Sequence, residues 1–243
     1  MAGTTRPRPE VDDRTVITRF DKVERVVHWV NAVLFAVVIL SGATLYFEPL
    51  VALIGRRVLV ERIHVYTGLA LPVPILVAVA GRWGGALRAD LARFNRWTID
   101  DRRWMRTVLK AREFKLPARA RLRAGKFNAG QKLNAAFTAG VIIVMLMTGV
   151  IMRWYKPWPL TWRTGATFVH DWVALAVVIV IFGHISFALS DRDSLRSMWT
   201  GTISRAWARR HAPAWLDELR EAPTGAEPPR RAPKTRRPAR RNR

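Results

Sequence analysis

The 243-residue sequence contains no cysteine. This absence excludes disulfide bonds, iron–sulfur clusters, thiolate catalysis and covalent haem attachment through C-x-x-C-H. Any bound metal must therefore be held by histidine, methionine or oxygen ligands. Acidic residues are also scarce, with 18 Asp and Glu against 41 Lys and Arg, a formal net charge of +23. A chain that is half apolar and so basic either binds polyanions or places its apolar residues in lipid.

Four apolar segments are long enough to cross a hydrocarbon core about 30 Å thick, which needs about 20 apolar residues. We expect these helices at residues 26–47, 63–80, 133–152 and 166–189. The second is the shortest, and its Pro72 and Pro74 predict a kink. Residues 1–13 show no apolar core of a cleavable signal, so the first segment is expected to remain as a membrane helix. The predicted fold is an all-α membrane protein, a four-transmembrane-helix bundle.

The basic residues are distributed unevenly between the segments that connect these helices. Lys and Arg number 6 before the first helix, 15 in the loop 82–132 and 14 after the fourth helix, which is 35 of the 41. Positive charge gathers on the cytoplasmic side of bacterial membrane proteins. Both termini and the 82–132 loop are therefore expected to be cytoplasmic, in a multi-pass membrane protein.

This pattern predicts three regions along the chain. Residues 1–18 form a polar N-terminus, residues 19–220 the membrane domain, and residues 221–243 a disordered basic tail. The tail lacks an aromatic platform for nucleic acid, so the favoured interpretation is a basic tail that is solvated, sets the topology or contacts lipid headgroups. Within the 82–132 loop, the segment NRWTIDDRRWMRTVL is typical of a basic amphipathic helix on the inner membrane surface.

Four of the five histidines fall within the expected spans: His28, His64, His170 and His184. An ionisable side chain at membrane depth is a functional candidate, because its burial is costly. With the N-terminus inside, His28 and His184 lie near the inner ends of their helices, and His64 and His170 near the outer ends. The histidines therefore sort into an inner pair and an outer pair.

The last helix contributes one histidine to each pair, at a spacing of 14 residues. In an α-helix this spacing returns to within about 40° of the same face after a rise of about 21 Å. Two b haems, each with two axial histidines, fit such positions. The alternatives are interhelical hydrogen bonds or a headgroup location for each histidine; a zinc site would need all four at one depth. Gly42, Gly68 and Gly149 could leave room for a planar cofactor or serve plain helix packing.

The sequence resembles the membrane cytochrome b (gamma) subunit of respiratory formate dehydrogenases, within the bacterial di-haem cytochrome b561-like group. The resemblance covers about residues 18–220. The matching motifs are His28-Trp29, Ile63-His64, N-A-G-Q-K at 128–132, T-G-V-I at 148–151, His170, His184, A-W-A at 206–208 and H-A-P-A-W at 211–215.

The resemblance implies two haems b, the cytoplasmic one held by His28 and His184 and the outer one by His64 and His170. It also implies that Asn128, Gly130 and Gln131, with His184 nearby, line a site for menaquinone or ubiquinone. Electrons would arrive from an iron–sulfur beta subunit and, through it, from a molybdopterin catalytic alpha subunit. From the residues alone, the segment is a loop that enters a helix with Asn128 as its N-cap, and this interpretation is favoured over a quinone site.

Other assignments stay open at this point. The chain could serve a hydrogenase, a thiosulfate reductase or another periplasmic oxidoreductase, or it could be a non-redox membrane scaffold or transporter. Nothing in the sequence could oxidise formate, so substrate chemistry would belong to another subunit. A higher-order oligomer is compatible with the sequence.

Overall fold

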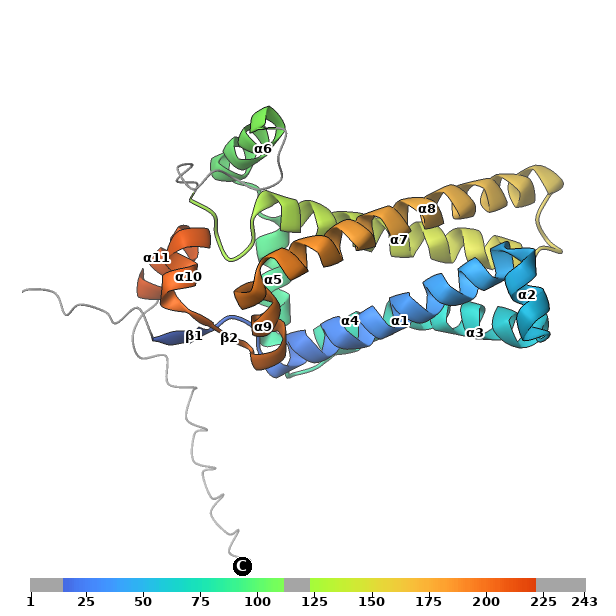
Figure 1. Cartoon of the computed structure of the whole chain (residues 1–243), viewed down its shortest axis with the longest axis horizontal. Helices are drawn as coiled ribbons and strands as arrows, with labels where there is room; N and C mark the ends of the chain where they lie inside the picture. Colours follow the sequence, from blue (N-terminus) through green and yellow to red (C-terminus); the bar gives the residue numbers. More distant parts are fainter. Residues whose placement is uncertain (1–14, 112–122, 222–243) are drawn as a thin grey trace, which may run out of the picture.

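The computed structural model describes residues 15–111 and 123–221, which form a mostly helical chain (Figure 1). Its elements are β1 (Val16–Thr18), α1 (Lys22–Tyr46), α2 (Glu48–Ile54), α3 (Arg57–Ala70), α4 (Val73–Ala80), α5 (Gly85–Asn95), α6 (Ile99–Ala111), α7 (Ala129–Arg153), α8 (Leu160–Ser190), α9 (Arg192–Thr200), β2 (Thr202–Ser204), α10 (Arg205–His211) and α11 (Pro213–Glu221). The predictions for residues 1–14 and for the tail from residue 222 lie outside the described residues.

The four expected membrane spans are confirmed as long apolar helices. They are α1, α3 with α4, α7 and α8, and their mean hydropathy is 2.0, 1.9, 2.3 and 2.4. Large apolar side chains on these helices, such as Leu40 and Phe182, point away from the protein. Exposed apolar surface of this extent marks contact with something other than water. The chain is therefore a multi-pass membrane protein.

The second span is interrupted, as its prolines predict. α3 ends at Ala70 and α4 begins at Val73, with Pro72 in the capping position and Pro74 in the first turn of α4. Proline has no N–H to continue a helical ladder, so the helix breaks where the two prolines begin. α3 also begins six residues before the expected start at residue 63, at Arg57.

Two spans begin earlier than their apolar runs because capping boxes set their first residues. Asp21 accepts a hydrogen bond from the Glu24 amide, and Glu24 accepts one from the Asp21 amide, both at 2.7 Å. Asn128 and Gln131 repeat this arrangement before α7, both at 3.0 Å. These reciprocal bonds satisfy amides that have no partner inside the helix. The first turns of α1 and α7 are therefore charged or polar, and each helix begins four residues before its apolar segment.

The bundle consists of two helical hairpins (Figure 1). α1 packs along α3, and α7 packs along α8. The hairpins meet through α3 and α7 and through α5, which crosses one end of the bundle against α1, α4 and α7. We call this the α5 end, and the opposite end, where α2 lies, the α2 end.

Both ends of the described chain meet at the α5 end. β1 pairs antiparallel with β2, with Ile17 opposite Ile203, so the described chain is not entirely α-helical. Arg19 is buried there and donates hydrogen bonds to Ser194 at 2.9 Å and Ser197 at 3.3 Å. Its burial lowers the pKa of the guanidinium to about 10, against the opposing pull of Asp191. The pairing is consistent with an even number of spans, whereas the cytoplasmic location of this end stays a prediction.

Three further helices lie at the α5 end: α6 belongs to the long 82–132 segment, and α10 and α11 belong to the C-terminal region. α6 confirms the helix expected within the loop, and its position on a membrane surface stays a prediction. After β2, α10 and α11 form a small apolar core. Its members are Ile203, Trp207, Ala208, Ala212, Trp215 and Leu216.

Candidate functional site

The structure brings the four membrane histidines together in the two expected pairs. The ring centres of His28 on α1 and His184 on α8 lie 6.2 Å apart. Those of His64 on α3 and His170 on α8 lie 6.3 Å apart. The first pair lies toward the α5 end and the second toward the α2 end, and each joins one hairpin to the other. The chain itself buries none of the four rings fully, so part of each ring surface is available to a bound group.

The spacing within each pair is informative. A direct N–H···N hydrogen bond of about 2.9 Å would place two imidazole centres no more than about 5.2 Å apart. Two imidazoles that bind one metal ion from opposite sides, at about 2.0 Å each, have centres about 6.3 Å apart. The observed 6.2 and 6.3 Å agree with the second arrangement. The residues of both pairs therefore fit axial ligation of a haem iron.

Neighbouring side chains orient the pair at the α2 end. Ser41 Oγ lies 3.1 Å from Nδ1 of His64, and Thr148 Oγ1 lies 2.8 Å from Nδ1 of His170. These contacts involve Nδ1 and leave Nε2 of each ring for a metal. Across the described ranges, no cluster of three or more His, Asp or Glu side chains could hold a metal ion by itself. Each histidine pair thus offers two nitrogen ligands, fewer than the four ligands of a tetrahedral metal site.

Two glycines that the sequence singled out pack against these rings. A Cβ on Gly42 would lie 3.1 Å from Cε1 of His64, and one on Gly149 would lie 3.6 Å from Cε1 of His170. Gly42 therefore gives the His64 imidazole the room it needs. Gly68 differs, because a Cβ there would meet nothing within 4 Å.

Asn128, Gly130 and Gln131 lie at the start of α7, toward the α5 end. The side-chain oxygens of Asn128 and Gln131 accept the capping hydrogen bonds, so the predicted N-cap is confirmed. The amide NH₂ groups of both residues remain as donors. Gly130 permits the close approach of α6, since a Cβ there would lie 2.8 Å from the Trp104 ring.

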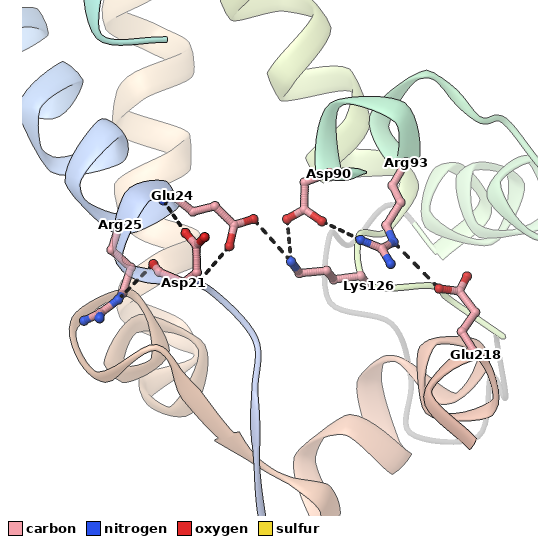
Figure 2. Close-up of polar contacts among 7 residues, drawn as sticks. All are labelled: Asp21, Glu24, Arg25, Asp90, Arg93, Lys126 and Glu218. Atoms are coloured by element: carbon pink, nitrogen blue, oxygen red, sulfur yellow. Dashed lines mark hydrogen bonds and ion pairs between the residues drawn. The ribbon is translucent and has the colours of Figure 1, made fainter. Parts of the chain in front are cut away.

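A buried ion cluster fixes this segment against α1 and α5 (Figure 2). Lys126 Nζ lies 2.5 Å from an Asp90 oxygen and 3.4 Å from a Glu24 oxygen, and all three side chains are at most 6% exposed. Asp90 also pairs with Arg93 at 2.8 Å, and Arg93 reaches Glu218 of α11 at 3.7 Å. The cluster connects the first turn of α1, one turn before His28, to the residues that precede Asn128.

A second buried pair lies on the other side of Asn128. Lys132 Nζ lies 2.7 Å from Asp101 of α6 and donates a 2.8 Å hydrogen bond to the Arg96 carbonyl. Sequence reasoning assigned no role to either lysine. Lys126 is separated from Glu24 by 102 residues and from Asp90 by 36, so no local pattern links them. Ser41 and Thr148 were missed likewise, because a hydroxyl in an apolar helix is ordinary by itself.

Comparison with known proteins places the chain in a family. The model of the family described as prokaryotic cytochrome b561 matches residues 19–201. The chain is 28% identical over 221 residues to the cytochrome b556(Fdn) subunit of the nitrate-inducible formate dehydrogenase of Escherichia coli K12, which covers 85% of this chain and 93% of the relative. It is 27% identical to the formate dehydrogenase cytochrome b556(fdo) subunit of the same strain, over 86% of this chain and 95% of the relative. The corresponding Haemophilus influenzae subunit is 24% identical over 86% of each chain.

These matches confirm the resemblance that the sequence motifs indicated. A cytochrome b carries haem b and transfers electrons, which agrees with the fit of the histidine pairs. The chain belongs to the prokaryotic cytochrome b561 family of membrane cytochromes b.

Proposed function

We propose that the chain is the membrane subunit of a formate dehydrogenase complex, which binds two haems b and transfers electrons across the inner membrane to a quinone. The observation that carries this proposal is the presence of two histidine pairs, 6.2 and 6.3 Å between ring centres, toward opposite ends of one bundle. His28 and His184 would hold one haem, and His64 and His170 the other. The relatives named above are cytochrome subunits of formate dehydrogenases.

The two sites share helix α8, which sets their separation. His170 and His184 are 14 residues apart, a rise of about 21 Å along a helix. Haem b would supply reversible one-electron transfer at each site, while the protein supplies ligation, orientation and electrostatics. The basic character of the α5 end favours a cytoplasmic location for it, so electrons would move from the periplasmic α2 end toward the cytoplasm.

The quinone site would lie beside His184, at the start of α7. Asn128 and Gln131 would donate hydrogen bonds from their amide NH₂ groups to a quinone carbonyl, since their oxygens are engaged in capping. Gly130 belongs to the same turn. The buried pairs of Lys126 and Lys132 would keep this turn in register with α1 and α6. Protons for quinone reduction would come from the cytoplasm, and menaquinone and ubiquinone both suit this chemistry.

The electron donor would be an iron–sulfur beta subunit docked at the α2 end, connected to a molybdopterin catalytic alpha subunit. This chain cannot supply the iron–sulfur clusters itself, because it has no cysteine to bind them. The gene should therefore lie beside genes for a large molybdopterin protein and a cluster-rich protein. A neighbourhood that instead encodes a hydrogenase would overturn the assignment to formate dehydrogenase.

Haem content tests the central part of the proposal. Purified protein should show a reduced-minus-oxidised b-type spectrum and two haems per chain. His64→Ala and His170→Ala should each remove one haem and spare the other. His211→Ala is the matched control, because His211 is exposed and lies outside both pairs. Two haems remaining in either pair variant would contradict the assignment of ligands.

Quinone reduction is tested by separating hydrogen-bond donation from helix capping. Gln131→Ala should slow quinone reduction without loss of haem. Gln131→Glu keeps an acceptor for the Asn128 amide, as in an ordinary capping box, but removes the NH₂ donor. It should therefore slow the reaction as well. Full turnover in Gln131→Glu would show that Gln131 caps the helix and does not donate a hydrogen bond to quinone.

A further inference from the structure

Two hydroxyl–glycine dipeptides contact the histidine pair at the α2 end. Ser41 and Gly42 on α1 face His64 of α3, and Thr148 and Gly149 on α7 face His170 of α8. In each case the hydroxyl lies against Nδ1 of the ring, and the glycine lies against Cε1. The same two-residue arrangement therefore occurs in both hairpins, each time on the helix packed beside the histidine.

Each of these hydroxyls has a carbonyl acceptor on its own helix. Ser41 Oγ lies 2.6 Å from the Val37 carbonyl oxygen, and Thr148 Oγ1 lies 2.8 Å from the Val144 carbonyl oxygen. A carbonyl oxygen can only accept, so each hydroxyl donates its single hydrogen to its own helix. A lone pair of each hydroxyl then faces the imidazole.

A hydroxyl that donates to its own helix leaves the histidine as the donor in both contacts. In this arrangement Nδ1 of His64 and of His170 carries the hydrogen, and Nε2 of each ring has a free lone pair. The Val38 carbonyl oxygen, 3.2 Å from Nδ1 of His64, supports this tautomer independently, because it too can only accept. Nδ1–H with an unprotonated Nε2 is the form that binds a metal through Nε2.

We propose that Ser41 and Thr148 are positioning residues that hold His64 and His170 in the Nδ1–H tautomer and increase their donation to the haem iron. This inference rests on the proposed haem between the two rings. A hydrogen bond from Nδ1–H makes the imidazole more basic and stabilises oxidised iron, which lowers the midpoint potential. In the described parts of the chain, neither His28 nor His184 has a hydroxyl or carbonyl partner of this kind. The hydrogen bonds of Ser41 and Thr148 thus act on one haem, the one at the α2 end, and favour electron flow from that haem toward the other.

Thr148→Val in the purified holoprotein is the principal test, because valine keeps the shape of threonine and removes the hydroxyl. The midpoint potential of one haem should become more positive, and the ferric low-spin EPR signal of that haem should shift. The affinity of that haem for its site, measured by competition with apomyoglobin, should fall about 10- to 100-fold, the usual effect of losing a partner of a metal-binding histidine. The other haem should be unaffected, and Thr148→Ser should restore wild-type behaviour. Ser41→Ala should act in the same direction more weakly, because the Val38 carbonyl remains for His64.

Matched controls separate this role from a structural one. Thr44 on α1 and Thr138 on α7 donate to the Leu40 and Asn134 carbonyls at 2.9 and 2.8 Å, as Ser41 and Thr148 do to theirs, but have no histidine contact. Thr44→Val and Thr138→Val should leave both potentials and both signals unchanged. If Thr148→Val retains two haems with unaltered potentials, or Thr148→Ser behaves like Thr148→Val, the positioning role is wrong. Loss of one haem in Thr148→Val with recovery in Thr148→Ser would support it. A wild-type protein without two haems would instead refute the proposed function on which it rests.

Discussion

Replacement of Lys126 by methionine should release the long loop from the bundle. Lys126 lies between the carboxylates of Asp90 and Glu24, with nearly all of its side chain buried. Methionine fills similar space but has no charge, so the substitution leaves two carboxylates close together without their shared cation (Figure 2). Asp90 keeps its contact with Arg93, whose side chain is 38% exposed.

The expected cost follows from the geometry. At an effective dielectric constant of about 20, the attraction of Lys126 to Asp90 at 2.5 Å is about 7 kcal/mol. The attraction to Glu24 at 3.4 Å is smaller than the roughly 5 kcal/mol of two full charges, because burial raises the pKa of the Glu24 carboxyl to about 7. Desolvation of the buried ions, at several kcal/mol each, offsets much of this attraction. Removal of one partner from a buried ion pair accordingly costs about 3–5 kcal/mol.

Hydrogen exchange measured by mass spectrometry on the purified holoprotein reports this cost locally. Since about 1.4 kcal/mol is a factor of ten, the opening equilibrium of α5 and of residues 123–131 should rise by about a hundredfold to several thousandfold. The membrane helices should remain protected.

Two further variants make the result decisive. Arg123→Met removes an exposed pair with Asp217, which is worth at most about 1 kcal/mol. Neutralising the carboxylates as well, with Glu24→Gln and Asp90→Asn, should recover much of the protection lost in Lys126→Met. If Lys126→Met exchanges no faster than Arg123→Met, or if the neutralised variant is as open as Lys126→Met, burial of the cluster does not stabilise the loop.

Three other outcomes are expected. Gly42→Ala should displace the His64 ring, since the new Cβ would lie 3.1 Å from Cε1, and should lower the haem content to about one per chain. Gly149→Ala should retain two haems, because its Cβ would lie 3.6 Å from Cε1 of His170. Equal haem contents in the two variants would contradict this difference in packing. Asn128→Ala should cost about 1 kcal/mol of stability in thermal unfolding and Asn128→Asp almost nothing, and equal losses would mean that the cap is not what stabilises α7. Fusion of alkaline phosphatase after α11 should be inactive and fusion of a fluorescent protein active, as a cytoplasmic C-terminus requires; the reverse would invert the topology.

The spans, the kink and the histidine positions could be predicted because each depends on local sequence. Apolar length predicts membrane crossing, and Pro72 breaks the ladder wherever it lies. Helix starts were predicted less well: α1 and α7 begin at Lys22 and Ala129, four residues ahead of the apolar runs. Hydropathy reports where a chain enters lipid, whereas a capping box determines where the helix begins.

The β1–β2 pair and the buried lysines show a different limit. β1 is three residues of the polar N-terminal region, and it becomes a strand only because β2, far along the chain, supplies its hydrogen bonds. In the sequence, Lys126 is one of many cations in a basic loop, and only the structure shows that it pairs with Glu24 and Asp90. Such partners are chosen by the folded arrangement, and no spacing in the sequence identifies them.

The chain without cysteine thus determined much of its own chemistry. The missing thiols restricted the metal ligands, apolar length determined the spans, and helical periodicity placed His170 and His184 on one face of α8. Only the tertiary structure decided that the ring centres stand 6.2 and 6.3 Å apart, that Nδ1 of His64 and His170 faces a hydroxyl, and that Lys126 is buried. The physical reason is that periodicity and hydropathy act within one helix, whereas ligand spacing, tautomer and ion pairing depend on where separate helices pack.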